Sequence, residues 1–451
     1  MRAALLLALA ALAGDSAPAA YQAVHFLPDP ESRVVAVALR FPAGAAEDPV
    51  GQEGRAHLFG RVLQRAATDP LIGHGAQVLV EVGAEETVVV LLAAPDSWRE
   101  ALRELEALLY TRVPTQAEVD AARAEAAQVL QFEEGAPVRG FERERAALLL
   151  GPTHPAARPA VGTVGTIVGL QPSDLAAFRT EHLPRGSGVA ALTGPVDRAE
   201  VEAAFQSSVS LVTLGRAPLP RPLPVPADAA GAAAAPVSGA DGTATLPPPP
   251  VLRTHGVGLP PLRVPATATG APAWSTPERV VLDRSLTSTW MAIAFPFPPG
   301  SPGFLLDFLA HLVIENLIRT PPDPGLFEAD VSVERIRDAP VVVISASVDP
   351  FRAEEWEGRL RSAFDSLGSA PPEGAFFELT RRRFRSRVFL DLAAPENLVR
   401  WIVREASLGR VPLADPEVEL WRLEREGVAE AAQAAGPPRS LLYGPQGLTG
   451  R

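Results

Sequence analysis

The residues best suited to chemistry lie around His57, in the stretch Gly54-Arg55-Ala56-His57-Leu58-Phe59-Gly60-Arg61. A helix with the spacing His-x-x-Glu-His places two imidazoles on one face, where they bind zinc while the Glu activates a water molecule. Only His57 fits that spacing here. Gly60 has no carboxylate, and Arg61 places a permanent cation where a neutral imidazole would ligate the metal. The stretch therefore holds one of the three residues that such a zinc-binding helix needs.

The other histidines do not indicate a second metal site. His311 and Glu315 have the i, i+4 spacing of a ligand pair, but they lie in a leucine-rich helical stretch where no third ligand is evident. We expect them to form an ordinary pair on a helix. His74 lies between two glycines, which predicts a turn.

Two arginine features leave alternatives open. Arg61 either pairs with a carboxylate such as Glu53 or Glu81, which would make it a structural strut, or is solvated. The run Arg381 to Arg387 is the densest basic segment of the chain. It predicts a solvated helix face, with contact to an acidic partner as the alternative.

The bulk composition excludes several classes of function. The chain has 451 residues and is 47% hydrophobic, enough for more than one domain. A net charge of −12 argues against a nucleic-acid partner. With no cysteine, the chain has neither disulfides nor a thiol nucleophile.

Residues 1–20 have the pattern of a cleaved secretory signal. Arg2 supplies a positive charge, Ala3 to Ala13 form an apolar run, and small residues follow. The run is too short to span a bilayer, and no later segment is long and apolar enough to do so. An ordinary buried helix is the alternative. We expect a signal peptide and a periplasmic or secreted mature protein.

The remaining sequence divides into two similar halves around residues 216–278, which are rich in Pro and Ala and predict a linker. A motif for a Pro-binding module is the alternative for this segment. Val35 to Gly44 matches Met291 to Gly300, and each is followed by a helix, two strands and an amphipathic helix. This repetition predicts an α+β protein with homologous domains at 21–215 and 279–446. We expect each to hold a mostly antiparallel sheet with helices on one face, and the two to face each other across a cleft.

Several segments together resemble the insulinase-like (M16) metallopeptidases. Thr153 to Thr163 is similar to that family's HPxGRPxxGT segment, and Ile167 to Leu175 follows it as in the family. Gly44, Asp48, Gly54 and His57 fit the loop that leads into the family's zinc helix. The resemblance covers residues 25–205 clearly and 285–445 more weakly.

The resemblance implies a third zinc ligand, a Glu on a later helix. Counting back from His154 places that position at Leu130, and a shift of one residue gives Val129 or Gln131. Glu125 or Glu133 would need a larger shift and a different helix face. We therefore expect an inactive peptidase site that holds no metal or other cofactor.

The family's second domain contributes an Arg and a Tyr that position substrate. Arg319 is a weak candidate for the Arg, but prolines follow it, and Phe327 or Glu328 lies where the Tyr is expected. The resemblance thus implies a non-catalytic subunit that binds extended peptides and supports a zinc-bearing partner in a heterodimer. A stand-alone peptide-binding or scaffold protein and an active metallopeptidase with atypical ligands are the alternatives.

Overall fold

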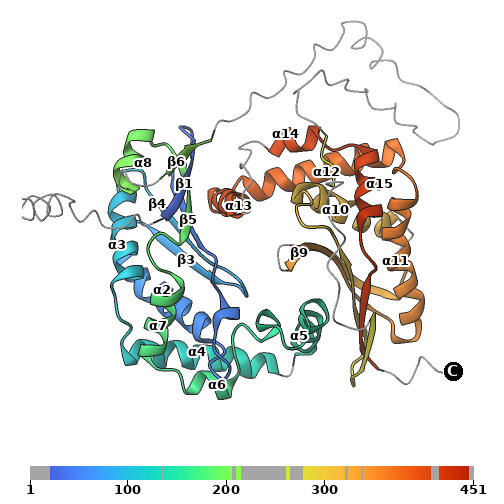
Figure 1. The fold of residues 1–451 in the computed structure, drawn as a ribbon, viewed down its shortest axis with the longest axis horizontal. Helices are drawn as coiled ribbons and strands as arrows, with labels where there is room; N and C mark the ends of the chain where they lie inside the picture. The colour runs from blue at the N-terminus through green and yellow to red at the C-terminus, as the bar shows by residue number, and fades with distance from the viewer. Residues whose placement is uncertain are drawn as a thin grey trace, which may run out of the picture.

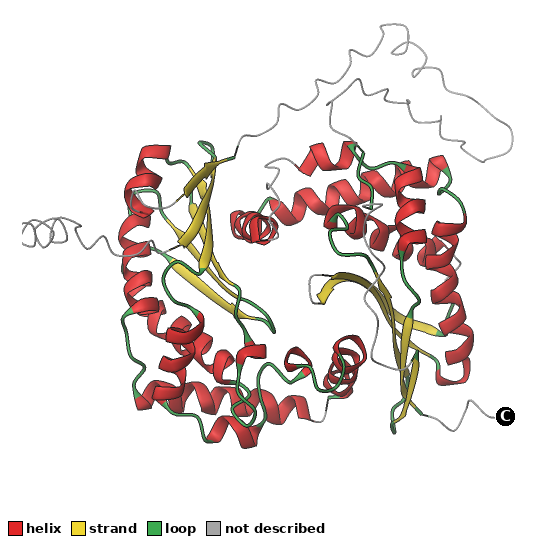
Figure 2. Cartoon of the chain, viewed as in Figure 1, coloured by secondary structure: helices red, strands yellow, loops and turns green. Residues whose placement is uncertain are grey.

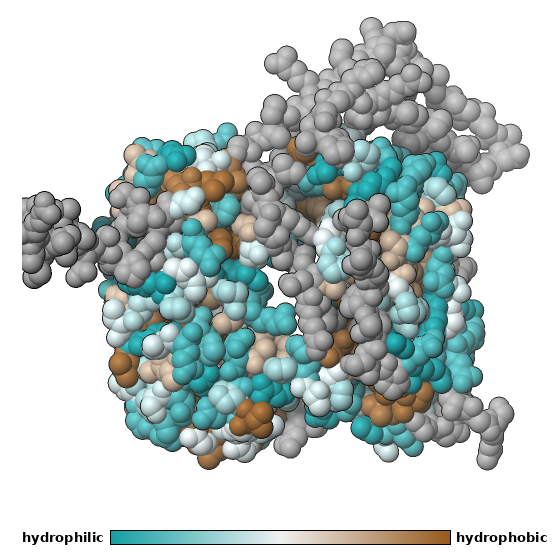
Figure 3. Space-filling model, viewed as in Figure 1, coloured by the Kyte–Doolittle hydropathy of each residue, from teal (hydrophilic) through white to brown (hydrophobic). Residues whose placement is uncertain are grey.

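The computed structural model describes residues 21–134, 136–205, 210–214, 261–264, 278–319, 323–336, 339–407 and 416–445. They form two halves, and each half has a sheet on its inner side and helices on its outer side (Figures 1 and 2). The two sheets face each other, as the sequence predicts. On the face seen in Figure 3 the described surface is hollowed between the halves.

The first sheet has six strands in the order β3-β4-β2-β5-β1-β6. The pairs β3–β4, β4–β2 and β2–β5 are antiparallel, whereas β5–β1 and β1–β6 are parallel. The strands are β1 (Tyr21–Pro28), β2 (Val35–Phe41), β3 (Gln77–Val82), β4 (Thr87–Ala93), β5 (Gly188–Gly194) and β6 (Ser210–Thr213).

All but one of the helices of the first half cover the outer face of this sheet, and they enclose a core with Phe41, Trp98 and Phe178. The central helix is α2 (Arg55–Ile72), which packs against β3 and against three other helices. The remaining elements are η1 (Ala45–Glu47), α3 (Trp98–Tyr110), α4 (Gln116–Glu134), α5 (Pro137–Leu150), η2 (Pro155–Ala157), α6 (Val164–Val168), α7 (Pro172–His182) and α8 (Arg198–Phe205).

The second half repeats this plan with five strands in the order β7-β11-β8-β10-β9. Only β11–β7 is parallel, so the sheet is mostly antiparallel. Its strands are β7 (Arg279–Asp283), β8 (Thr289–Pro296), β9 (Leu326–Ile336), β10 (Ala339–Val348) and β11 (Arg439–Gly444). Its other elements are α10 (Gly303–Arg319), η3 (Pro350–Arg352), α11 (Ala353–Ser369), α12 (Gly374–Leu392), α13 (Pro395–Ser407), α14 (Pro416–Trp421) and α15 (Arg425–Ala434).

Each half lends one helix to the inner face of the other half's sheet. Helix α13 of the second half buries Val399, Ile402 and Val403 against β2, β4 and β5 of the first. Helix α5 of the first half buries Phe141 and Leu148 against β8 and β11 of the second. Both contacts remove apolar surface from water, so the same hydrophobic packing that stabilises a protein core also holds the two halves together.

An ion pair accompanies each exchanged helix. Arg400 of α13 lies 3.2 Å from the carboxylate of Glu81 on β3. Arg145 of α5 pairs with Glu334 on β9. Strands β3 and β9 are each at the edge of a sheet, so each exchanged helix also fixes one edge strand of the opposite half.

Four residues of the segment predicted as a linker pack on the second half. Within 261–264, Leu262 is buried in the second core and its amide donates to the carbonyl of Arg422. Arg263 pairs with Glu424 and Glu430. This part of the predicted linker is therefore packed on the second half through Leu262 and Arg263. The predicted signal peptide and most of the predicted linker lie outside the described residues.

Candidate functional site

The site predicted from the sequence lies on helix α2, which begins directly after Gly54. Gly54 has a φ of 97°, and a β-carbon there would be 2.5 Å from the carbonyl oxygen of Val161. Only glycine fits a left-handed backbone at so close an approach. The turn sets the direction of α2. Within the helix, His57 and Arg61 lie one turn apart on a half-exposed face.

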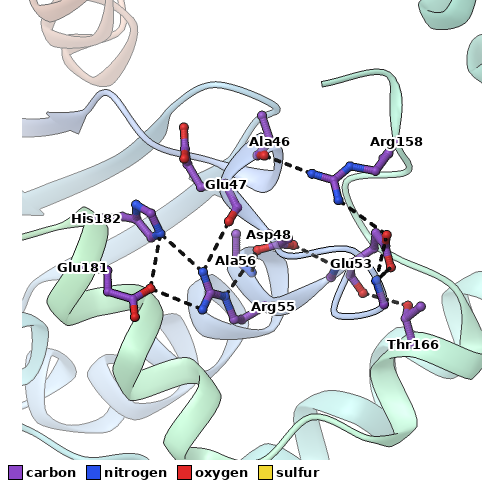
Figure 4. Close-up of polar contacts among 12 residues, drawn as sticks. Ala46, Glu47, Asp48, Glu53, Arg55, Ala56, Arg158, Thr166, Glu181 and His182 are labelled. Carbon is purple, nitrogen blue, oxygen red and sulfur yellow. Dashed lines mark hydrogen bonds and ion pairs between the residues drawn. The ribbon is translucent and has the colours of Figure 1, made fainter. Parts of the chain in front are cut away.

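Asp48 caps the start of α2 from the preceding loop. Its carboxylate accepts the amides of Gly54 at 2.9 Å and Ala56 at 3.0 Å (Figure 4). The side chain is 2% exposed. Burial raises the pKa of Asp48 to about 6, although the two amides and Arg55 favour its charged form.

Arg55 links the start of α2 to the end of α7. Its guanidinium lies 3.7 Å from Asp48, 3.5 Å from Glu181 and 3.3 Å from Nε2 of His182 (Figure 4). It also donates to the carbonyl of Glu47 and lies over the ring of Phe178. A buried cation with these partners holds two helices in register. Nothing in the sequence predicts this role for Arg55, although the residue lies within the Gly54 to Arg61 stretch.

The segment around 153–163 supports the same loop. Arg158 pairs with Glu53 at 3.5 Å and donates to the carbonyl of Ala46 at 3.1 Å (Figure 4). Gly162 approaches the carbonyl of Glu53 so closely that a β-carbon would lie 2.1 Å from its oxygen. Thr166 donates to that carbonyl at 2.7 Å. The motifs behind the sequence resemblance therefore position the start of α2.

Gly60 lies where the general base of a His-x-x-Glu-His helix would be, and the space beside it is filled. It is buried against β3. A β-carbon at this position would be 2.6 Å from Cγ2 of Val82 and 3.4 Å from Cγ1 of Val80. A larger side chain at this position requires that the Val82 side chain, the strand or the helix move.

Arg61 pairs with Glu125 of α4 rather than with Glu53 or Glu81, so those two suggested partners are wrong. Its Nη1 atom lies 3.6 Å from Oε1 of Glu125, and Arg65 lies 3.8 Å from the other oxygen. Glu53 instead pairs with Arg158, and Glu81 with Arg400. The Arg61 and Glu125 side chains are 41% and 46% exposed, so the pair is close to solvent.

Helix α4 places a carboxylate, not an apolar residue, beside position 61. Leu130, the position that the sequence predicts for the third ligand, is partly buried against the first core. Glu125 is the α4 residue that reaches Arg61. Among the described residues no group of three or more His, Cys, Asp or Glu side chains is arranged to hold a metal ion.

Solved structures show which fold this is. An inactive M16 peptidase domain from Pseudomonas fluorescens is 14% identical, has a TM-score of 0.69, and the match covers 93% of this chain and 95% of that one. A protease from Helicobacter pylori is 12% identical with a TM-score of 0.70, over 96% of this chain and 99% of that one. The fold is that of the M16 peptidases.

The periplasmic protease PqqL from Escherichia coli has the same fold in part of its length. It is 10% identical with a TM-score of 0.64, and the match covers 92% of this chain but 43% of that one. No protein-family model and no curated protein matches the sequence. The likeness to the M16 peptidases is therefore one of structure, beside the short motifs described above.

The substrate-positioning residues expected in the second half of this M16 fold are placed only in part. Helix α10 ends at Arg319, whose side chain lies outside the described residues. Phe327 is the second residue of β9 and is 58% exposed, and Glu328 is also exposed.

The remaining sequence candidates have structural surroundings. His311 lies 3.8 Å from Glu315, which is buried and paired with Arg383. His74 lies in the turn after α2, and His154 accepts the amide of Ala156. Within the arginine run, four side chains pair inside the chain: Arg381 with Glu378, Arg383 with Glu315, Arg385 with Glu417, and Arg387 with Asp391.

Among the described residues, no helix is long and apolar enough to cross a membrane.

Proposed function

We propose that this chain is a non-catalytic member of the M16 family that binds extended peptides and supports a zinc-bearing M16 partner. The observation that carries the proposal is the packing at Gly60, where Val82 occupies the space that a catalytic base would need. A missing side chain alone would be one substitution away from repair. A filled space requires in addition that the Val82 side chain or the elements around it move.

The pair formed by Arg61 and Glu125 supports the same conclusion. A zinc site needs three protein ligands. The Arg61 guanidinium repels a dication and also pairs with Glu125, the carboxylate that lies beside it. His57 then remains as a single imidazole among the expected ligands, which cannot retain zinc. The domain carrying α2 therefore serves to complete a shape and not to cleave.

Peptide binding is the activity that the rest of the fold supports. Two sheets face each other, and each presents an edge strand, β3 or β9, with a backbone that can pair with an extended chain. Such pairing reads the peptide backbone rather than its sequence. We therefore assign the chain unfolded or extended peptides as ligands.

The place of action that we propose is the periplasm or the exterior of a bacterial cell. The pattern of residues 1–20 supports it, as does the likeness to a protein described as a periplasmic protease. Under this proposal the signal is removed before Tyr21, which is buried at the start of β1.

A pull-down from the native cell envelope tests the partner. Co-elution of a protein that carries zinc and an intact His-x-x-Glu-His supports the heterodimer. Recovery of bound peptides without such a protein would favour the stand-alone peptide-binding alternative. The proposal fails if the purified chain alone retains one zinc per molecule and cleaves an unfolded protein.

A matched variant separates the lost ligand from the lost base. Arg61→His supplies a second imidazole beside His57 and Glu125 and leaves Gly60 unchanged. We expect it to bind zinc more tightly than the wild type in a calorimetric titration, yet to cleave nothing, because Gly60 supplies no carboxylate to act as the base. Peptide cleavage by this variant would contradict the assignment of Gly60 as the position of the missing base.

A further inference from the structure

Strand β3 is one of the two edge strands of the first sheet in the described part of the chain, and alternate residues of β3 point their backbone groups away from β4. The register identifies which ones. Gly83 donates to the carbonyl of Glu86 at 2.8 Å, so Gly83 and Glu86 form a hydrogen-bonded pair at the hairpin end. Hydrogen-bonded and non-bonded pairs alternate from there, and Val82↔Thr87 and Val80↔Val89 are partners. The amides of Val78, Val80 and Val82 therefore point outward.

The central one of these three amides is already occupied. The Oε1 atom of Gln64, on α2, accepts the amide of Val80 at 3.1 Å. Gln64 lies one helical turn beyond Gly60, and the absence of a side chain at Gly60 lets α2 approach Val82 and Val80 closely. Gly60, which lacks the carboxylate of a catalytic base, thus also lets the Gln64 side chain reach the edge of the sheet.

We propose that Gln64 closes the free edge of the first sheet by occupying the amide of Val80, and so controls whether an extended peptide can pair with β3. This inference rests on the proposed function, because it concerns where the proposed peptide binds. An added strand needs consecutive outward groups of the edge strand as its partners. With Gln64 in place, the peptide must displace a side chain at the middle of the pairing segment.

The expected size of the effect follows from one hydrogen bond. When a peptide carbonyl replaces Gln64 as the acceptor of the Val80 amide, one hydrogen bond is broken and one is formed. This exchange contributes no net binding free energy. Removal of the side-chain acceptor should therefore tighten peptide binding about fivefold, the factor that corresponds to one ordinary hydrogen bond. Gln64 acts here as a positioning residue for the edge, and it touches no reacting atom.

Amide hydrogen exchange of β3 tests the contact without any ligand. Gln64→Ala removes the acceptor, and we expect the amide of Val80 to exchange about fivefold faster than in the wild type. Gln64→Glu retains an acceptor and should keep the wild-type rate. Gln128→Ala, an exposed position on α4, controls for the change in helix propensity. Equal exchange at Val80 in Gln64→Ala and the wild type would overturn the proposal.

Binding of a permanently unfolded protein, reduced and carboxymethylated lactalbumin, tests the consequence. Tighter binding by Gln64→Ala than by the wild type, with Val80 then protected by the probe, supports the inference. Equal binding by both would overturn it and leave the proposed function standing. Binding by Gln64→Ala alone supports the closed edge but contradicts peptide binding by the native chain. Binding by neither would overturn both.

Discussion

Gly60 and Val82 are so close that a β-carbon on the glycine would lie 2.6 Å from Cγ2 of the valine. The contact joins the second turn of α2 to the end of β3, with Gly60 buried and Val82 partly buried. It makes the position of the absent catalytic base a packing contact between a helix and a sheet.

Gly60→Ala should therefore lower the free energy of unfolding, although alanine favours helices over glycine. Overpacking of a buried contact costs about 1–3 kcal/mol. Val82→Ala in the same chain should recover part of the loss, because it removes the methyl groups that clash. Urea unfolding of the two single variants and the double variant measures the coupling.

Gly358, in the middle of α11, provides the matched control because a β-carbon there meets nothing within 4 Å. Gly358→Ala should raise the free energy of unfolding by about 0.5–1 kcal/mol through helix propensity alone. A similar gain from Gly60→Ala would show that the space beside Gly60 is open.

Arg61→Ala should change the free energy of unfolding by less than about 0.5 kcal/mol. The partner lies 3.6 Å away, and both side chains are more than a third exposed, so solvent screens the pair. Thermal and urea unfolding measure this directly. A loss of 2 kcal/mol or more would restore the strut interpretation of Arg61, with Glu125 as its partner.

Arg55→Ala is the contrasting change at the other end of the same helix. It should cost about 3 kcal/mol, because it leaves the buried carboxylate of Asp48 without its cation. A loss no larger than that of Arg61→Ala would mean that the contacts around Arg55 carry no stability.

Asp48 should make the stability of the chain depend on pH between about 4 and 6. Its pKa is about 6 in the folded protein and 3.8 in the reference state, so the folded state holds the proton more tightly in this interval. The free energy of unfolding should fall as the pH rises from 4 to 6, by at most about 3 kcal/mol from this group. Above pH 6 the contribution is absent.

Asp48→Asn removes the titrating group while keeping one acceptor oxygen for the amides of Gly54 and Ala56. The free energy of unfolding of the wild type minus that of this variant, measured by urea unfolding at several pH values, should fall as the pH rises from 4 to 6. It should stay constant outside that interval. A difference that is constant across that interval would contradict the raised pKa.

Ile402→Ala should destabilise the first half although the residue belongs to the second. Ile402 is fully buried against the first sheet, and such truncations cost about 2–5 kcal/mol. The backbone amides of β2 should exchange faster in this variant than in the wild type, because α13 packs against β2. Leu390→Ala, at a side chain that is 76% exposed, is the control and should leave both measurements unchanged.

Much of the element order follows from the sequence, because apolar periodicity and glycine turns act locally. The helix, two strands and amphipathic helix predicted after Val35 to Gly44 are α2, β3, β4 and α3. The repeat between the halves also correctly predicts two sheets that face each other. These features depend on neighbours along the chain.

The features missed are contacts between distant segments. The pattern of α13 indicates an amphipathic helix, but nothing in it says that Ile402 covers the sheet of the other half. The partner of Arg61 depends on how α2 crosses α4, so the pairing with Glu125 could not be predicted from the sequence. The closure of the edge at Val80 depends on a close approach that only the packing of Gly60 reveals.

The exchange of α5 and α13 has a consequence for how the chain can be divided. Each half carries a piece that the other needs to cover its sheet, so the apolar contacts at Phe141 and Ile402 fasten the halves independently of the covalent connection. A protease that cuts the Pro-rich connection would leave a two-piece protein that stays assembled. The two halves expressed as separate polypeptides should associate with each other. Either polypeptide alone would expose the apolar inner face of its sheet to solvent.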